Sequence, residues 1–191
     1  MNNSTRVAIA FVMAAGLVAA TAAPRAHAVA KLIGLNGKPI GLATFQQTPR
    51  GVLIEIDARG LPPGAHAMMI HTTASCDPKT SFTSAGPVFS FEQAKPHGYL
   101  ATGGPRAGDL PHQFAASDGT LHASTLTNAF SLGNGKKSIF DRDGASLIIH
   151  AEADDYTSQP DGNSGRRIAC GTVIRTVAPG MRKGASRRMH K

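Results

Sequence analysis

Residues 51–58 read Gly51-Val-Leu-Ile-Glu-Ile-Asp-Ala58, and the apolar side chains Val52, Ile54 and Ile56 alternate there with two acidic ones. Apolar residues at every second position are typical of a β-strand with one face on the core and the other in water. The pattern therefore predicts a half-buried strand over residues 51–58.

Short apolar runs of the same kind lie on both sides of this stretch, and no stretch has the pattern of an amphipathic helix. The runs cover residues 30–35, 40–45, 67–71, 121–126, 146–150 and 168–177. Turn residues separate them at 60–64, 118–119, 133–135 and 161–163. Many short strands with such turns predict an all-β sandwich or barrel. Two connections are long, at 72–117 and 151–167, and loops of that length are usually functional or pinned.

The N-terminal 28 residues have the features of a signal peptide. A polar start ends in Arg6, an Ala-rich apolar stretch covers residues 7–23, and Ala26-His27-Ala28 forms a small-x-small cleavage site. The apolar stretch is shorter than the roughly 20 residues of a transmembrane helix. Cleavage leaves 163 of the 191 residues, which we expect to form one periplasmic or secreted domain over residues 29–175.

Basic residues are concentrated at the C-terminus. The chain has 20 Lys and Arg against 12 Asp and Glu, and six of these basic residues lie from Arg175 to Lys191. Residues 176–191 are rich in Gly, Ala, Ser and basic side chains, so we expect a disordered basic tail. The tail is either simply solvated or attached to anionic surfaces of the cell envelope. Nucleic acid is not an expected partner outside the cytoplasm.

Two cysteines, Cys76 and Cys170, remain after export into an oxidising space. A disulfide is the default expectation for such a pair. The alternative is a reactive thiol pair, although the chain has no Cys-x-x-Cys motif.

Several short strings, read in order, resemble the bacterial copper/zinc superoxide dismutases. They are Pro63-Gly-Ala-His66-Ala-Met-Met69-Ile-His71, Ser84-Ala-Gly-Pro87, His97-Gly98, Gly108-Asp109-Leu-Pro111, His150-Ala-Glu-Ala-Asp154-Asp155-Tyr156 and Gly165-Arg-Arg167-Ile-Ala-Cys170. The resemblance covers residues 30–174. It implies an eight-stranded antiparallel Greek-key barrel whose two long loops carry a metal centre that acts on superoxide.

The resemblance implies four copper-binding histidines, and only two of those positions hold histidine here. His71 and His150 match family ligands, whereas Met69 stands in place of the first histidine and Val88 in place of the histidine that bridges copper and zinc. Met69 either coordinates copper through its thioether or merely fills the vacated space. Copper binding therefore stays open at this stage.

The zinc side is also altered. Its implied ligand positions are Val88, His97, Arg106 and Asp109, of which only His97 and Asp109 can coordinate. Structural zinc needs four ligands, so zinc binding is doubtful. We expect the Arg106 guanidinium to pair with Asp109 in place of the metal, and a rearranged zinc site that recruits His112 is the alternative.

Three further positions match functional residues of the family. Arg167 matches the arginine that attracts superoxide, and Asp154 matches the acid that orients the histidines of both metal sites. His66 matches a structural histidine rather than a ligand.

These substitutions leave three hypotheses in order of preference. The first is a degenerate family member without efficient dismutation and with at most weak copper affinity. The second is a periplasmic Cu(I)-binding protein that uses Met69, His71 and His150, and the third is an active superoxide dismutase with an unusual copper site. Members of the family occur as monomers or dimers, so the sequence leaves a homodimer open.

Overall fold

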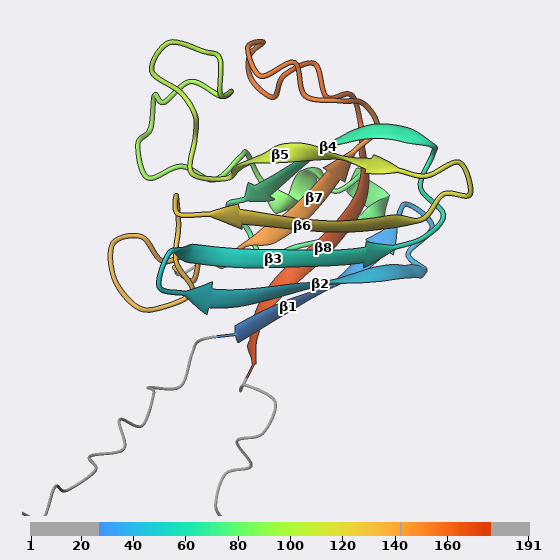
Figure 1. Cartoon of the computed structure of the whole chain (residues 1–191), viewed down its shortest axis with the longest axis horizontal. Coiled ribbons are helices and arrows are strands. Elements are labelled where there is room, and N and C mark those ends of the chain that lie inside the picture. The colour runs from blue at the N-terminus through green and yellow to red at the C-terminus, as the bar shows by residue number, and fades with distance from the viewer. Residues whose placement is uncertain (1–26, 142, 177–191) are drawn as a thin grey trace, which may run out of the picture.

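The computed structural model describes residues 27–141 and 143–176, which form one sheet of eight antiparallel strands (Figure 1). The strands are β1 (His27–Gly34), β2 (Pro39–Thr48), β3 (Gly51–Ala58), β4 (Gly64–His71), β5 (Asp109–Ala115), β6 (Leu121–Thr127), β7 (Ser146–His150) and β8 (Arg167–Thr176). Two single-turn 3-10 helices, η1 (Pro78–Thr80) and η2 (Thr83–Ala85), lie between β4 and β5. No helix of this described part is long and apolar enough to cross a membrane.

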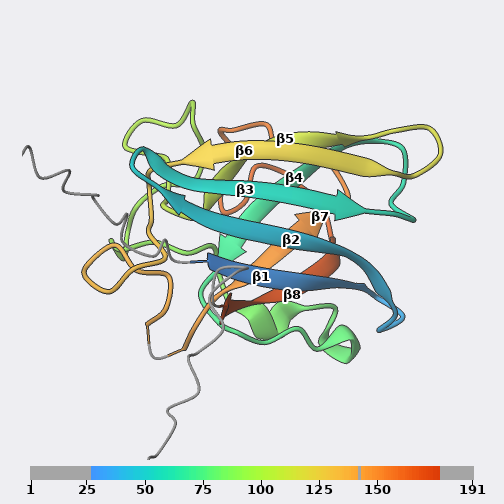
Figure 2. The ribbon, with the colours of Figure 1, turned by 60° about the horizontal axis from the view of Figure 1, so that its bottom comes forward.

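The strand order is β5-β4-β7-β8-β1-β2-β3-β6, and the sheet curls into a nearly closed barrel (Figure 2). The chain leaves β3 beside β6 and re-enters the sheet at β4, between β5 and β7, which is a Greek-key connection. The predicted all-β Greek-key barrel is confirmed.

The barrel interior is filled by the apolar residues that the alternation predicts. In β3, Val52, Ile54 and Ile56 are buried whereas Glu55 and Asp57 are exposed. Large buried side chains from the other strands complete this core, among them Leu32, Phe45, Met68, Ile70, Leu121, Leu147 and Ile149. The barrel is therefore a packed core, and any site must lie on its outside or in its loops.

The prediction of one long loop over residues 72–117 was wrong, because β5 lies within it. The burial of β5 does not alternate: Asp109 and Leu110 are buried side by side, while Pro111 and Phe114 are exposed. β5 is a terminal strand of the sheet order and pairs only with β4 in the described ladders. An edge strand tolerates proline because one side of its backbone needs no partner.

The ends of the barrel extend slightly beyond the predicted domain of 29–175. His27 pairs with both Gln46 and Thr176, so β1 begins two residues before Val29, the expected start of the mature chain. The rest of the predicted signal peptide, residues 1–26, and the basic tail from residue 177 lie outside the described residues.

A disulfide joins Cys76 to Cys170, as predicted, with a Cα–Cα distance of 5.6 Å. Cys170 belongs to a second small core with Phe82, Ala85 and Ile148, separate from the barrel interior. The bond therefore pins the segment that contains η1 and η2 against β8. It spans 94 residues, for which chain entropy gives about 4–5 kcal/mol of stabilisation.

Candidate metal centre

His71 and His150 face one another at the ends of two neighbouring strands. His71 is the last residue of β4 and His150 the last of β7; the strands pair antiparallel, so the two residues lie at opposite ends of the ladder and only their side chains approach each other. Their ring centroids are 5.9 Å apart with an angle of 28° between the ring planes. Both side chains are buried, so the copper-side histidines expected from the sequence lie together.

Backbone carbonyls fix the proton of each ring on Nδ1. His71 Nδ1 lies 2.8 Å from the carbonyl oxygen of Gly86, and His150 Nδ1 lies 3.2 Å from that of Gly165. The Ser164 hydroxyl also lies 2.9 Å from His150 Nδ1, and a hydroxyl can accept as well as donate. A carbonyl oxygen only accepts, so an Nδ1 that bonds one donates, and the Nε2 of that neutral ring carries a bare lone pair. Both Nε2 atoms are buried and have no hydrogen-bond partner among the described residues.

Burial also keeps both rings uncharged. It lowers the pKa of His71 to about 3, and the charges of Arg167 and His150 contribute to the same shift. Burial lowers the pKa of His150 as well, against a smaller opposing effect of its bond to Gly165. At neutral pH the two histidines therefore present lone pairs that are free to bind a metal ion.

The other two implied copper positions form an apolar patch beside these rings. Met69 and Val88 are buried and pack with Ala67 in a small cluster that is distinct from the barrel core. Val88 also pairs with His71 through an isolated β-bridge. The space next to the two imidazoles is thus occupied by hydrocarbon and a thioether.

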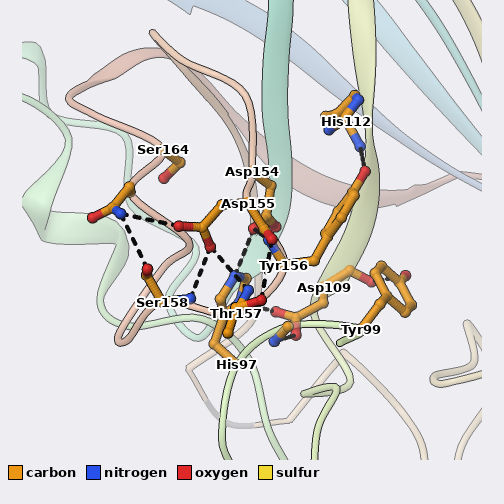
Figure 3. A network of polar contacts seen from close by, with 12 residues as sticks. His97, Tyr99, Asp109, His112, Asp154, Asp155, Tyr156, Thr157, Ser158 and Ser164 are labelled. Carbon is orange, nitrogen blue, oxygen red and sulfur yellow. Dashed lines mark hydrogen bonds and ion pairs between the residues drawn. The ribbon is translucent and has the colours of Figure 1, made fainter. Parts of the chain in front are cut away.

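The zinc-side residues form a direct network, drawn in Figure 3. His97 Nδ1 lies 2.7 Å from Asp109 Oδ1, and His97 Nε2 lies 3.0 Å from Asp154 Oδ1. The second oxygen of Asp109 accepts bonds from the backbone N–H groups of Gly98 and Arg106, at 2.8 and 2.9 Å. The three side chains are fully shielded from solvent.

These residues do not fit a zinc ion. Two ligands of one tetrahedral zinc, each about 2 Å from the metal, lie roughly 3.3 Å apart, whereas His97 and Asp109 are in direct contact at 2.7 Å. The Nε2–Asp154 bond would be compatible with a metal on Nδ1, but Nδ1 is taken up by Asp109, and Val88 and Arg106 supply no further ligand. Residues 27–141 and 143–176 contain no group of three His, Cys, Asp or Glu side chains placed to hold a metal, so the rearranged site with His112 finds no support either.

The carboxylates control the charge of His97. Burial alone would lower its pKa, but the hydrogen bonds to Asp109 and Asp154, together with their charges, outweigh burial and raise the pKa to about 9. The two acids therefore favour the charged, imidazolium form of His97.

The expected pairing of the Arg106 guanidinium with Asp109 was wrong. Arg106 touches Asp109 through its backbone N–H, and its side chain donates to the carbonyls of Lys95 and Pro160 at 2.8 and 3.0 Å. One oxygen of Asp109 bonds the His97 ring and the other accepts two backbone N–H groups, so the Arg106 guanidinium bonds backbone carbonyls instead.

Arg167 borders the copper-side histidines. Its two terminal nitrogens donate to the carbonyls of Phe82 and Gly86, at 2.7 and 2.8 Å. The Gly86 carbonyl also accepts the proton of His71 Nδ1, so one oxygen links the arginine to the histidine. A pocket of about 400 Å³ opens here, lined by His71, Thr83, Gly86, Pro87, Val88, Arg106, Pro160, Asp161 and Arg167.

Sequence reasoning missed the residues that act through the backbone. The Gln159 amide both donates to and accepts from the backbone of His97, at 2.8 and 2.9 Å. Gly86 supplies the carbonyl shared by His71 and Arg167. No side-chain signal marks such contacts, because they depend on how the two loops meet.

The Greek-key barrel carries two facing histidines on adjacent strands and a buried polar network between two loops, both outside its apolar core. The chain belongs to the copper/zinc superoxide dismutase family, since the family model described as copper/zinc superoxide dismutase (SODC) matches residues 40–173.

Named relatives agree with this assignment. The chain is 41% identical to "Superoxide dismutase [Cu-Zn] 2" of Aquifex aeolicus, over 82% of this chain and 92% of that protein. It is 37% identical to "Superoxide dismutase-like protein YojM" of Bacillus subtilis, over 75% of this chain and 74% of that one. The crystal structure of a SOD-like protein from Bacillus subtilis superposes with a TM-score of 0.72 at 35% identity, covering 76% of this chain and 97% of the other.

Proposed function

We propose that this protein is exported by residues 1–28 to the periplasm or beyond, lacks efficient superoxide dismutation, and binds Cu(I) through His71 and His150. The observation that carries the proposal is the pair of buried Nε2 atoms without partners. An unpaired buried polar atom costs free energy, and a metal ion shared by both atoms would recover it.

The chemistry of this pair favours the reduced ion. Copper, when bound here, would supply a one-electron redox centre. Two neutral imidazoles without further strong ligands suit Cu(I), which accepts few ligands. The chain itself holds the lone pairs in place through the Gly86 and Gly165 carbonyls and buries both rings. Copper is in this reading the cargo of the protein.

Val88, at the position of the family's bridging histidine, disfavours efficient dismutation. Val88 cannot ligate a metal or carry a proton between two sites, and it packs against Met69. The zinc side offers no replacement, because His97 is engaged on both nitrogens. Arg167 still borders the pocket above His71, so a small anion such as superoxide has a route to this half of the site.

The test is an anaerobic titration of the purified periplasmic protein with Cu(I) against a chromophoric chelator. We expect one Cu(I) per chain, lost in His71→Ala and in His150→Ala. The matched control is His122→Ala, because His122 is exposed on β6 and away from the pocket lining. We expect no dismutation above the rate of the copper-free protein.

Two other outcomes correspond to the remaining hypotheses. If no Cu(I) binds tightly, the barrel serves as a binding or structural module without metal. Turnover within about tenfold of a conventional relative would establish an active dismutase and overturn the proposal, since that factor is only about 1.4 kcal/mol of barrier.

A further inference from the structure

The site equivalent to the family's zinc position joins three separate parts of the chain. His97 lies in the connection before β5, Asp109 is the first residue of β5, and Asp154 lies in the connection after β7. Figure 3 shows the His97 ring between the two acids. All three side chains have an exposed fraction of 0%.

The hydrogen bonds require a proton on each nitrogen of His97. A neutral imidazole has one N–H, and an ionised carboxylate has no proton to offer to the other nitrogen. Buried carboxylates also need a cation, because an unpaired buried charge is expensive. We infer that the hydrogen-bonded bridge from Asp109 through the His97 ring to Asp154 takes the structural place of zinc in this protein. The inference does not depend on copper binding at His71 and His150.

Gly162 closes the site from the side of the second loop. A Cβ atom at this residue would lie 1.8 Å from Asp154 Oδ1 and 2.9 Å from His97 Nε2. Its φ of +67° is also in the left-handed region that favours glycine. The backbone therefore packs directly on the His97–Asp154 bond and holds this side of the bridge in place.

Three further contacts join the same two loops without a metal. The Gln159 amide pairs with the backbone of His97, and the Arg106 side chain donates to the Pro160 carbonyl. The Leu100 N–H donates to the Tyr156 carbonyl at 3.0 Å. Because Arg106 and Pro160 line the pocket above His71, the bridge also sets one wall of that pocket.

The first experiment is NMR of the full-length mature protein, labelled at histidine and dialysed against EDTA. We expect both ring nitrogens of His97 to carry protons at pH 7, in one slowly exchanging state that added zinc leaves unchanged. A neutral His97 would overturn the inference, and so would purified protein that contains one zinc per chain bound at His97.

The second experiment is hydrogen exchange of the backbone amides in EDTA. In His97→Gln we expect the amides of residues 98–106 and 155–162 to exchange roughly tenfold faster or more, which corresponds to the loss of a charge-assisted hydrogen bond. Amides of β2 and β3 should not change, and His122→Gln is the control. Unchanged loop exchange in His97→Gln would overturn the inference, as would exchange that slows when zinc is added to the wild type.

Asp154→Asn separates charge from shape. The amide keeps the size of the carboxylate but removes one of the two negative charges, so we expect one proton of the His97 ring to be lost at pH 8. A ring that stays doubly protonated in this variant would show that Asp154 does not hold the charge. If His97→Gln fails to fold, the measurements on the wild type and Asp154→Asn still decide.

Discussion

At the level of single residues, the copper-side histidines and the zinc-side histidine differ in the partners of their ring nitrogens. His71 and His150 each use Nδ1 on a backbone carbonyl and keep Nε2 bare, whereas His97 has both nitrogens on carboxylates. The partner atoms, rather than the histidine itself, decide whether a ring serves as a ligand or as a cation. One side of the centre thus presents buried nitrogens without partners, and on the other side both ring nitrogens are engaged.

Met69→Leu tests whether the thioether at the first copper position coordinates. Met69 is packed between Ala67 and Val88, so we expect it to act as a space filler. The exchange conserves volume and should cost less than about 1.5 kcal/mol of stability. Competition titration with Cu(I) should give an affinity within about threefold of the wild type, and a loss greater than tenfold would instead make Met69 a third ligand.

Two segments of the long connection between β4 and β5 are held in place by different contacts. Residues 72–88 are held by the disulfide, by the small core around Phe82 and by Arg167. Residues 95–108 are held by His97 and Arg106 against the loop that follows β7. These two segments should therefore respond to different perturbations.

Reduction of the disulfide should destabilise the whole barrel. Cys76→Ser combined with Cys170→Ser removes the 94-residue crosslink, so we expect a loss of about 3–5 kcal/mol in the free energy of unfolding. Urea denaturation of the wild type, with and without reductant, measures the effect. Equal stability of the double variant and the oxidised wild type would contradict this account of the crosslink.

The loop clamp at His97 should respond to pH instead. The folded pKa is raised from 6.5 to about 9, so protonated His97 contributes its stabilisation in full below about pH 6.5 and loses it as the pH rises through 9. The neighbouring tyrosines should not titrate in this pH range, because burial raises the pKa of Tyr99 to about 12 and also raises the pKa of Tyr156.

The measurement is the free energy of unfolding in EDTA between pH 7 and pH 9.5. We expect a decrease on the order of 2–3 kcal/mol in the wild type. His97→Gln should show a flatter profile over the same range. A wild-type profile as flat as that of the variant would mean that His97 is neutral in the folded protein.

At the scale of the whole molecule, much of the excess positive charge lies in the sequence that follows the last strand. The chain carries 20 Lys and Arg against 12 Asp and Glu, and five basic residues lie after the end of β8, at 182, 183, 187, 188 and 191. Both described ends of the barrel lie on the neighbouring strands β1 and β8. A C-terminal segment can therefore be removed without cutting a strand.

Deletion of residues 177–191 should separate surface attachment from folding. Each basic residue near an anionic membrane contributes about 1 kcal/mol, so we expect loss of binding to vesicles that contain phosphatidylglycerol. The unfolding free energy and the Cu(I) stoichiometry should not change, because the barrel ends at Thr176. Co-sedimentation at low and high salt measures attachment, and salt-independent or undiminished binding by the truncated protein would exclude the tail as the anchor.

The sequence by itself determined the class of fold, the core and the pair of cysteines. Alternation in residues 51–58 reports burial directly, because successive side chains of a strand point to opposite faces. The resemblance also predicts the positions at which the family's metal ligands are replaced, and these remain predictions. The sequence did not predict the strand at 109–115, because apolar and polar residues need not alternate in an edge strand with Pro111 and an exposed Phe114.

Only the tertiary structure decided what the altered centre contains in place of metal ligands. His97, Asp109 and Asp154 are far apart in sequence, and their contact depends on how two loops close over each other. The same is true of the Gly86 carbonyl, which fixes the free nitrogen of His71 through a backbone atom that has no signature in the sequence. Hydrogen bonds act over about 3 Å, so the protonation and the ligand role of each histidine follow from the final packing of the loops rather than from residue type.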